Sequence, residues 1–212
     1  MRHSILVYAA LLAAIIPVAV LSQQLPRVDN CRIRPGALCA DMRLPGIDLH
    51  EAHLQNSQFM RTILTGANFQ GARLDHADLR QAKLREADLR KAKGQQADLR
   101  NAELNNATLQ WAAFDGAKLQ GVQLRHADLR ETSLVGADLE GAELRGALLA
   151  NANLQRANFR SASLKQALLA GANLEGAIFI NADLSDADLR GANIALARFD
   201  GAKMNGCRGC PG

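Results

Sequence analysis

Aromatic residues are scarce in this sequence. They account for 4% of its 212 residues, whereas hydrophobic residues account for 48%. Without large rings to fill irregular space, the core has to be built from Leu and Ala, which favours a narrow and regular interior. An excess of one charge is missing too, since 25 basic and 21 acidic residues leave a formal charge of +4. That balance is too even to indicate nucleic-acid binding.

Residue sets that are typical of enzymes are also missing. His50 and His53 lie in HEAH, which is not the HExxH motif of metalloproteases. The sequence shows no Ser/His/Asp set, no phosphate-binding loop and no converging pair of carboxylates. A solid Leu/Ala interior would leave no pocket for a substrate. The sequence therefore predicts a protein that is not an enzyme and that holds no metal or cofactor.

The first 22 residues differ in composition from the rest of the chain. Arg2 and His3 precede an uncharged apolar run over residues 5–21, and Val20 and Ser22 offer a cleavage site. This is the layout of a secretory signal peptide. An uncleaved anchor is the alternative, because the run is close to the shortest length that spans a membrane. The sequence thus predicts export to a periplasmic or lumenal location, or secretion, with no other membrane segment.

A period of five residues occupies most of the remaining chain. From Cys39 to Met204 every fifth position holds mostly Leu, and Ala usually stands two residues earlier. On an α-helix five residues advance about 500°, and on a flat strand an odd period alternates between faces, so both would leave leucines in water. A chain that turns a corner every five residues, with four sides to a coil, would bury them all. Such coils would stack about 4.8 Å apart.

Segments such as ADLRQ, AKLRE, ANFQG and ADLEG match the motif A(D/N)LXX, and the chain resembles the pentapeptide-repeat proteins over most of its length. The resemblance implies an all-β fold, a right-handed quadrilateral β-helix of about eight coils. We assign residues 39–206 to this β-helix. The flanking regions are a signal peptide (1–22), an N-terminal cap segment (23–38) and a C-terminal tail (207–212).

Four cysteines allow three disulfide connectivities. The two ends of a tube lie tens of ångströms apart, whereas a disulfide needs Cα atoms within about 7 Å. We therefore expect the local pairs Cys31–Cys39 and Cys207–Cys210, which an oxidising compartment would favour. For the C-terminal pair an unbridged flexible tail stays open as an alternative. A redox or zinc role would need an electropositive, structured surrounding or two further ligands.

Residues twenty apart should lie one above the other in a four-sided coil. Gly94 takes a position otherwise held by Leu, one coil below Phe114. We expect the ring of Phe114 to lean over the space beside Gly94, although a local kink is the alternative. The same rule predicts an internal aromatic stack and an outward amide ladder, formed by Phe159, Phe179 and Phe199 and by Asn153, Asn173 and Asn193.

Two outward features stand out from a polar background. The first is a small apolar patch that could contact a protein partner or a second copy of the chain, with Trp111 as an added candidate anchor. The second is a basic row, read either as an anion-binding stripe or as a solvated face. The patch consists of Leu148, Ala150, Leu168 and Ala170, and the row of Arg85, Arg125, Arg145 and Lys165.

The sequence predicts an exported, non-catalytic scaffold or protein-binding module with a rigid β-helical surface and no nucleic-acid ligand. The resemblance suggests one alternative, a DNA mimic that binds a topoisomerase and protects it from quinolones. That mechanism requires a strongly acidic surface, whereas this chain carries a net positive charge. A further alternative is an envelope or stress structural protein without a specific partner.

Overall fold

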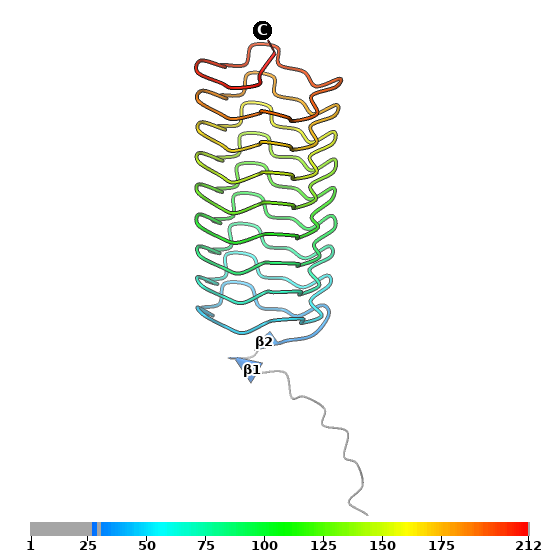
Figure 1. The fold of residues 1–212 in the computed structure, drawn as a ribbon. Helices are drawn as coiled ribbons and strands as arrows, with labels where there is room; N and C mark the ends of the chain where they lie inside the picture. The colour runs from blue at the N-terminus through cyan, green and yellow to red at the C-terminus, as the bar shows by residue number, and fades with distance from the viewer. Residues whose placement is uncertain (1–26, 29–30, 212) are drawn as a thin grey trace, which may run out of the picture.

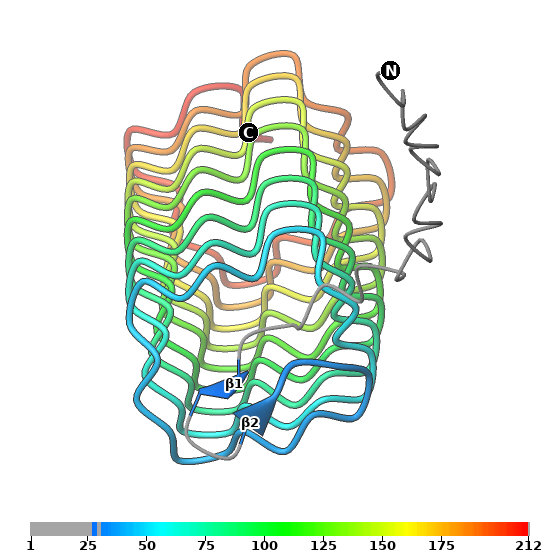
Figure 2. The ribbon, with the colours of Figure 1, turned by 90° about the horizontal axis from the view of Figure 1, so that it is seen from below.

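The computed structural model describes residues 27–28 and 31–211, so the predicted signal peptide lies outside the described residues. Strand β1 (Arg27–Val28) pairs antiparallel with β2 (Cys31–Arg32). Both lie at one end of a tube of stacked coils (Figure 1). Seen along the tube, successive coils follow the same outline (Figure 2). The part of the chain that the structure describes forms no helix, and therefore none that could cross a bilayer.

Parallel β-bridges define the coils. They join residues twenty apart and recur every five residues, from Leu38–Gln58 to Asp188–Arg208. Each coil therefore has four five-residue sides, as the period predicts. The all-β coil is confirmed, and its right-handed sense stays a prediction.

Backbone hydrogen bonds hold each side to its neighbours in the coils before and after it. On one side, the N–H of Leu79 donates to the carbonyl of Asp98 (2.7 Å) and the N–H of Gln81 to that of Arg100 (3.0 Å). The N–H of Asp78 donates in the other direction, to Ser57 (2.8 Å). These bonds satisfy the polar backbone between coils, so the wall is a regular ladder.

The corners require a left-handed backbone conformation. At three stacked corners φ is 58° for His76, 55° for Gln96 and 64° for Gly116. Glycine adopts this conformation freely, whereas other residues lose about 1–2 kcal/mol there. This cost is offset at many non-glycine corners because almost every side buries a large apolar residue.

Leu and Ala fill the interior, as the period predicts. Leu79 and Ala77 are both completely buried, and burying a leucine side chain contributes about 1.5–3 kcal/mol. Hydroxyl residues replace Ala at a few buried positions and bond to the preceding coil. Thr62 Oγ1 donates to the carbonyl of Cys39 (2.6 Å), and Thr132 Oγ1 to that of Leu109 (2.7 Å). A polar group is therefore tolerated inside only with a carbonyl partner.

Gly94 and Phe114 pack as a complementary pair. The ring of Phe114 occupies the place where a Cβ of Gly94 would stand. The N–H of Gly94 still donates to the carbonyl of Ala113 (2.7 Å), so the ladder continues without a kink. The expected compensation is confirmed. The large ring of one coil fills the space that the coil below leaves open.

The expected aromatic stack is also present. The ring centroids of Phe159 and Phe179 are 5.0 Å apart with planes within 1°, and Phe179 and Phe199 are 5.0 Å apart. In the expected amide ladder, Asn193 Nδ2 donates to Asn173 Oδ1 (3.1 Å).

Two local disulfides close the ends of the described coil stack. Cys31 pairs with Cys39 at a Cα separation of 5.1 Å, and Cys207 with Cys210 at 5.9 Å. The first pair is completely buried and links β2 to the first coil. The second is partly buried against the end of the core. Both pairings are the local ones expected from the tube.

Candidate functional site

The motif ADLR builds a charged clasp on the outer wall, by which we mean an Asp and an Arg two residues apart that bind each other. In the first clasp, Asp78 Oδ1 accepts from the backbone N–H (3.1 Å) and Nε (2.8 Å) of Arg80, and Oδ2 accepts from Nη2 (2.6 Å). Residues two apart on a strand face the same way, and a two-point guanidinium–carboxylate contact is stronger than a single one. The local sequence therefore sets this geometry.

The same clasp recurs along the tube. Arg100 Nε and Nη2 donate to Asp98 at 2.8 and 2.5 Å, one coil above Asp78 and Arg80. Arg80 Nε also lies 4.0 Å from Asp98 Oδ2, which links the two levels. Among the described residues, three further ADLR segments form clasps, namely Asp88–Arg90, Asp128–Arg130 and Asp188–Arg190.

The clasps keep their carboxylates charged. Hydrogen bonds from Arg80 lower the pKa of Asp78 against the opposing effect of burial. Burial acts to raise the pKa of Asp98, but the bonds from Arg100 outweigh it and the pKa falls below its ordinary value. In return, the carboxylates raise the pKa of Arg80 and of Arg100. Both partners of each clasp are therefore ionised at neutral pH.

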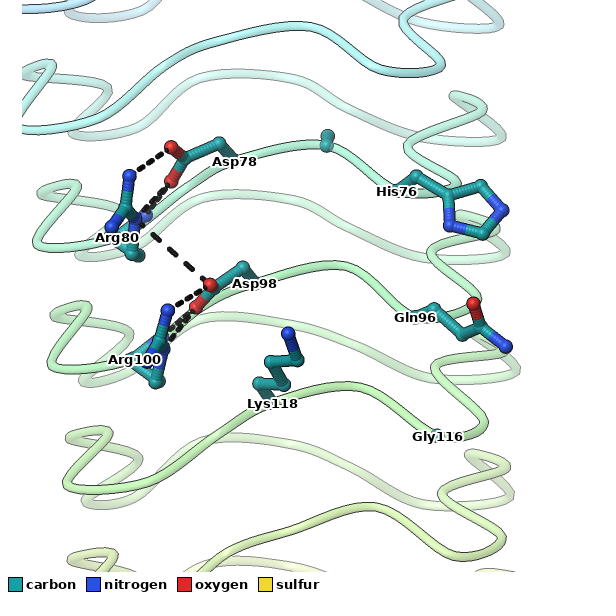
Figure 3. A pocket seen from close by; sticks show the side chains of 9 residues that line it. His76, Asp78, Arg80, Gln96, Asp98, Arg100, Gly116 and Lys118 are labelled. Atoms are coloured by element: carbon teal, nitrogen blue, oxygen red, sulfur yellow. Dashed lines mark hydrogen bonds and ion pairs between the residues drawn. The ribbon is translucent and has the colours of Figure 1, made fainter.

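Two stacked clasps form one wall of an open groove of about 610 Å³. His76 and Gln96 lie across from them, and Lys118 lies between the two groups on the next coil (Figure 3). Gly116 continues the corner column of His76 and Gln96 and adds no side chain to it. The groove therefore spans three coils and has one wall of ion pairs.

Lys118 differs from the other cations of the groove. Its side chain is exposed and makes no ion pair or hydrogen bond with any described residue. A smaller hollow of about 300 Å³ borders the same two arginines, Arg80 and Arg100, together with Arg61, which pairs with Asp41 at 2.6 Å. The two arginines thus form a ridge between two hollows.

The groove can hold a polar ligand by charge and hydrogen bonding. Its lining offers the donors of Arg80, Arg100 and Lys118 and the acceptors of two carboxylates. Within residues 31–211, no three His, Cys, Asp or Glu side chains gather as a metal site would require. The five-residue period does not by itself indicate this groove. The repetition of ADLR at 77–80 and 97–100, twenty residues apart, is the signal that could have found it.

The four residues of the apolar patch lie together on the opposite side of the coil. A parallel bridge joins Leu148 to Leu168, and the side chain of Leu168 is 41% exposed. Ala150 and Ala170 stand beside them and are partly buried. The patch interrupts a column of clasps, since its bridges continue to the clasp aspartates at 128 and 188.

Trp111 lies two levels below Asn151, in the corner column next to that of Ala150 and Ala170. It occupies a corner with φ of 58°, in a column that continues through Glu131. Its Nε1 donates to Glu131 Oε2 (2.9 Å), and 49% of the residue is exposed. The indole is thus held against its own wall by a hydrogen bond.

The basic row is largely paired with acids of the next coil. Arg85 contacts Glu103 at 2.9 Å, and Arg125 contacts Glu143 at 3.2 Å. Lys165 lies 3.2 Å from Asp183. Arg145 donates to the amide oxygen of Gln166 at 3.4 Å. The structure does not test anion binding by this row, but three of its four charges already face a carboxylate.

Comparison with known proteins shows the repeat throughout the coil. The family model described as pentapeptide repeats matches in eight copies, over residues 43–81, 82–121, 109–146, 137–173 and 167–206. HetL from the cyanobacterium Nostoc sp. strain PCC 7120, a pentapeptide repeat protein involved in heterocyst differentiation regulation, is 31% identical. The match covers 77% of this chain and 89% of HetL, with a TM-score of 0.44.

Two further solved structures are similar. QnrB1, a plasmid-mediated fluoroquinolone resistance protein, is 18% identical over 82% of this chain and 90% of its own, with a TM-score of 0.68. A pentapeptide repeat protein from the Arabidopsis thaliana thylakoid lumen is 30% identical over 46% of this chain and 65% of its own, with a TM-score of 0.25. No curated protein sequence matches the chain.

Proposed function

This chain belongs to the pentapeptide-repeat family, and from that premise we propose that it is a non-catalytic scaffold that binds another protein through its outer walls. One observation carries the proposal. Leu, Ala and Phe fill the coil interior, and the described core residues are almost all completely buried. The chemistry that another molecule can reach therefore lies on the walls, where outward residues vary without disturbing the core.

The apolar patch is the protein-contact surface in this proposal. Leu168 is exposed and Leu148 is half-buried, so apolar surface reaches solvent between clasps that are charged and polar. Removing that surface from water favours association. The patch is small compared with a standard interface, so the partner must also contact the polar wall around it. A second copy of the chain is one candidate partner.

Export is part of the proposal. Two disulfides tie down the described coil stack, and disulfides persist in oxidising compartments. The apolar run over residues 5–21 has the layout of a signal peptide. We therefore propose a periplasmic, lumenal or secreted location. Recovery of the protein from the cytosol of its host with the N-terminus intact would contradict this location.

A charge in the patch tests the proposed contact. Leu168→Glu should abolish specific capture of a partner from an extract of the native host, or abolish self-association in sedimentation velocity. Leu38→Glu is the matched control, because Leu38 holds the equivalent position of another repeat and is 68% exposed. The wild type and Leu38→Glu should retain the same protein. Equal capture and equal sedimentation of all three proteins would reject the contact.

The topoisomerase alternative has weaker support. The likeness to QnrB1 is one of fold alone at 18% identity, and a formal charge of +4 is opposite to that of a DNA mimic. A gyrase supercoiling assay with the purified protein separates the two functions. Protection of gyrase from a quinolone would favour this alternative over the scaffold.

A further inference from the structure

We propose that the groove lined by the clasps Asp78–Arg80 and Asp98–Arg100 and by Lys118 binds an extended acidic peptide segment of a partner protein. This inference rests on the proposed function, because it assumes a protein-binding scaffold. It concerns a different wall from the apolar patch, and it names the chemistry of the segment that the groove accepts.

The cations of the groove have hydrogen-bond donors that no described residue uses. Each clasp arginine uses Nε and Nη2 to hold its own aspartate, whereas Nη1 of Arg80 and of Arg100 makes no hydrogen bond with a described residue. The ammonium of Lys118 has no carboxylate partner among them either. Three cations on three successive coils therefore face the groove with donors to spare, and carboxylates are their natural acceptors.

The length of the groove suits an extended peptide. Coils repeat about every 4.8 Å, so three coils give a path of roughly 10 Å along the tube. An extended peptide rises about 3.3 Å per residue and would lay about three residues along that path. His76 and Gln96 lie across from the clasps (Figure 3) and are exposed, so a small anion would be poorly enclosed. A segment that can contact several levels at once fits better.

The mixed charges of the groove favour a peptide over a nucleic acid. Asp78 and Asp98 lie among the cations and repel carboxylates as well as phosphates, but a peptide, unlike a phosphodiester backbone, also brings N–H donors that these two aspartates accept. No Phe, Tyr or Trp side chain lines the described groove, so a base could stack only on the ring of His76 or on an arginine. A peptide suits the mixed lining, because its carboxylates meet Arg80, Arg100 and Lys118. Its backbone N–H groups can donate to the two aspartates and to Gln96.

Fluorescence anisotropy with defined probes tests the inference on the full-length protein. The probes are a labelled peptide of alternating Glu and Ala, the same peptide with Gln in place of Glu, and oligothymidylate of similar length. We expect the acidic peptide to bind about tenfold more tightly than the other two probes. Its affinity should fall as salt is added, because the groove is exposed.

The variants are chosen to leave the fold intact. Lys118→Gln removes the exposed cation without touching a clasp, and should weaken binding of the acidic peptide about fivefold. Lys83→Gln is the matched control, because Lys83 is an exposed lysine in the same AKL context on another side of the coil. It should leave the affinity unchanged.

Three results would overturn the inference. These are equal affinity for oligothymidylate, equal affinity for the Gln peptide, and equal effects of Lys118→Gln and Lys83→Gln. Leu168→Glu should not change peptide binding, because the patch lies on the opposite side. If Leu168→Glu abolishes partner capture while Lys118→Gln has no effect on peptide binding, the groove inference fails and the proposed contact stands. The reverse pattern rejects the contact through the patch and retains the groove.

Discussion

Two opposite sides of the coil use the same backbone and present different chemistry. On the groove side, the clasps at 78–80 and 98–100 follow one another directly, and Lys118 stands at the next level. On the patch side, two levels of Leu and Ala separate the clasps at 128–130 and 188–190. The ladder bonds are alike, with Asp78 N–H to Ser57 at 2.8 Å and Leu168 N–H to Ala147 at 2.9 Å. The difference lies entirely in the outward residues.

In this fold, inward residues stabilise the coil and outward residues form the surfaces that can bind a partner. Inward Leu and Ala residues stabilise every side of the coil in the same way. The chemical differences between the walls therefore come from the outward residues. Outward residues twenty apart in the sequence lie one above the other and form columns on the walls. A substitution at one level therefore changes the chemistry of its column and leaves the backbone of the coil unchanged. A polar groove and an apolar patch can therefore coexist on one scaffold.

The largest effect is expected inside the coil, where a substitution would disturb both walls at once. Gly94→Leu places a side chain in the space that the Phe114 ring occupies. Overpacking of this kind should lower the free energy of unfolding by about 3 kcal/mol in guanidinium denaturation. The double variant Gly94→Leu, Phe114→Leu should recover most of that loss, because it restores the ordinary Leu register. Equal stability of the single and double variants would refute the complementary packing.

The second-largest loss of stability is expected from a clasp on the patch side, compared with a clasp on the groove side. The side chain of Asp188 is only 7% exposed and contacts both Arg190 (2.7 Å) and Arg208 (3.3 Å), whereas that of Asp78 is 26% exposed. Hydrogen bonds from Arg190 lower the pKa of Asp188 to about 2. Asp188→Asn should therefore destabilise the protein at pH 7 more than Asp78→Asn does, as measured by thermal unfolding.

The stability lost in Asp188→Asn should depend on pH, because the pKa of Asp188 is lower in the folded protein than its ordinary value. A carboxyl whose pKa is lower in the folded state than its ordinary value of about 3.9 stabilises the fold fully above that value. The contribution is lost as the pH falls from about 4 through 2, where Asp188 becomes protonated. The stability gap between wild type and Asp188→Asn should thus be constant above pH 5 and close towards pH 2. A gap that persists at pH 2 would contradict the assigned ion pair.

The smallest effect is expected from moving the chemistry of the groove side to the patch side. The double variant Leu168→Asp, Ala170→Arg introduces the Asp and the Arg of a clasp into the patch. Because the motif acts locally, the pair should couple by about 0.5–1 kcal/mol in a double-mutant cycle of unfolding free energies. Partner capture through the patch should be lost, while the acidic peptide still binds the groove. No coupling would show that the clasp depends on more than its two residues.

Most of the architecture could be predicted from the sequence, because few backbone conformations bury Leu and Ala side chains that recur every five residues. The match of Gly94 with Phe114 followed from a simple twenty-residue offset, and the structure confirms it. The groove escaped prediction because its lining comes from three coils. Its shape depends on where the side chains of His76 and Lys118 point, which the period does not specify.

The pairing of the basic row could not be predicted from the sequence either. The twenty-residue offset predicts a column of cations, whereas in the structure Arg85 pairs with Glu103 and Arg125 with Glu143, partners eighteen residues apart. That spacing joins neighbouring coils diagonally, and side-chain rotation decides whether the charges meet. Which residues lie inside follows from the sequence alone, because burial of Leu and Ala dominates the free energy of the coil. Which surface charges are paired and which face solvent depends on the folded structure, because weak pairwise contacts between coils depend on geometry that composition does not encode.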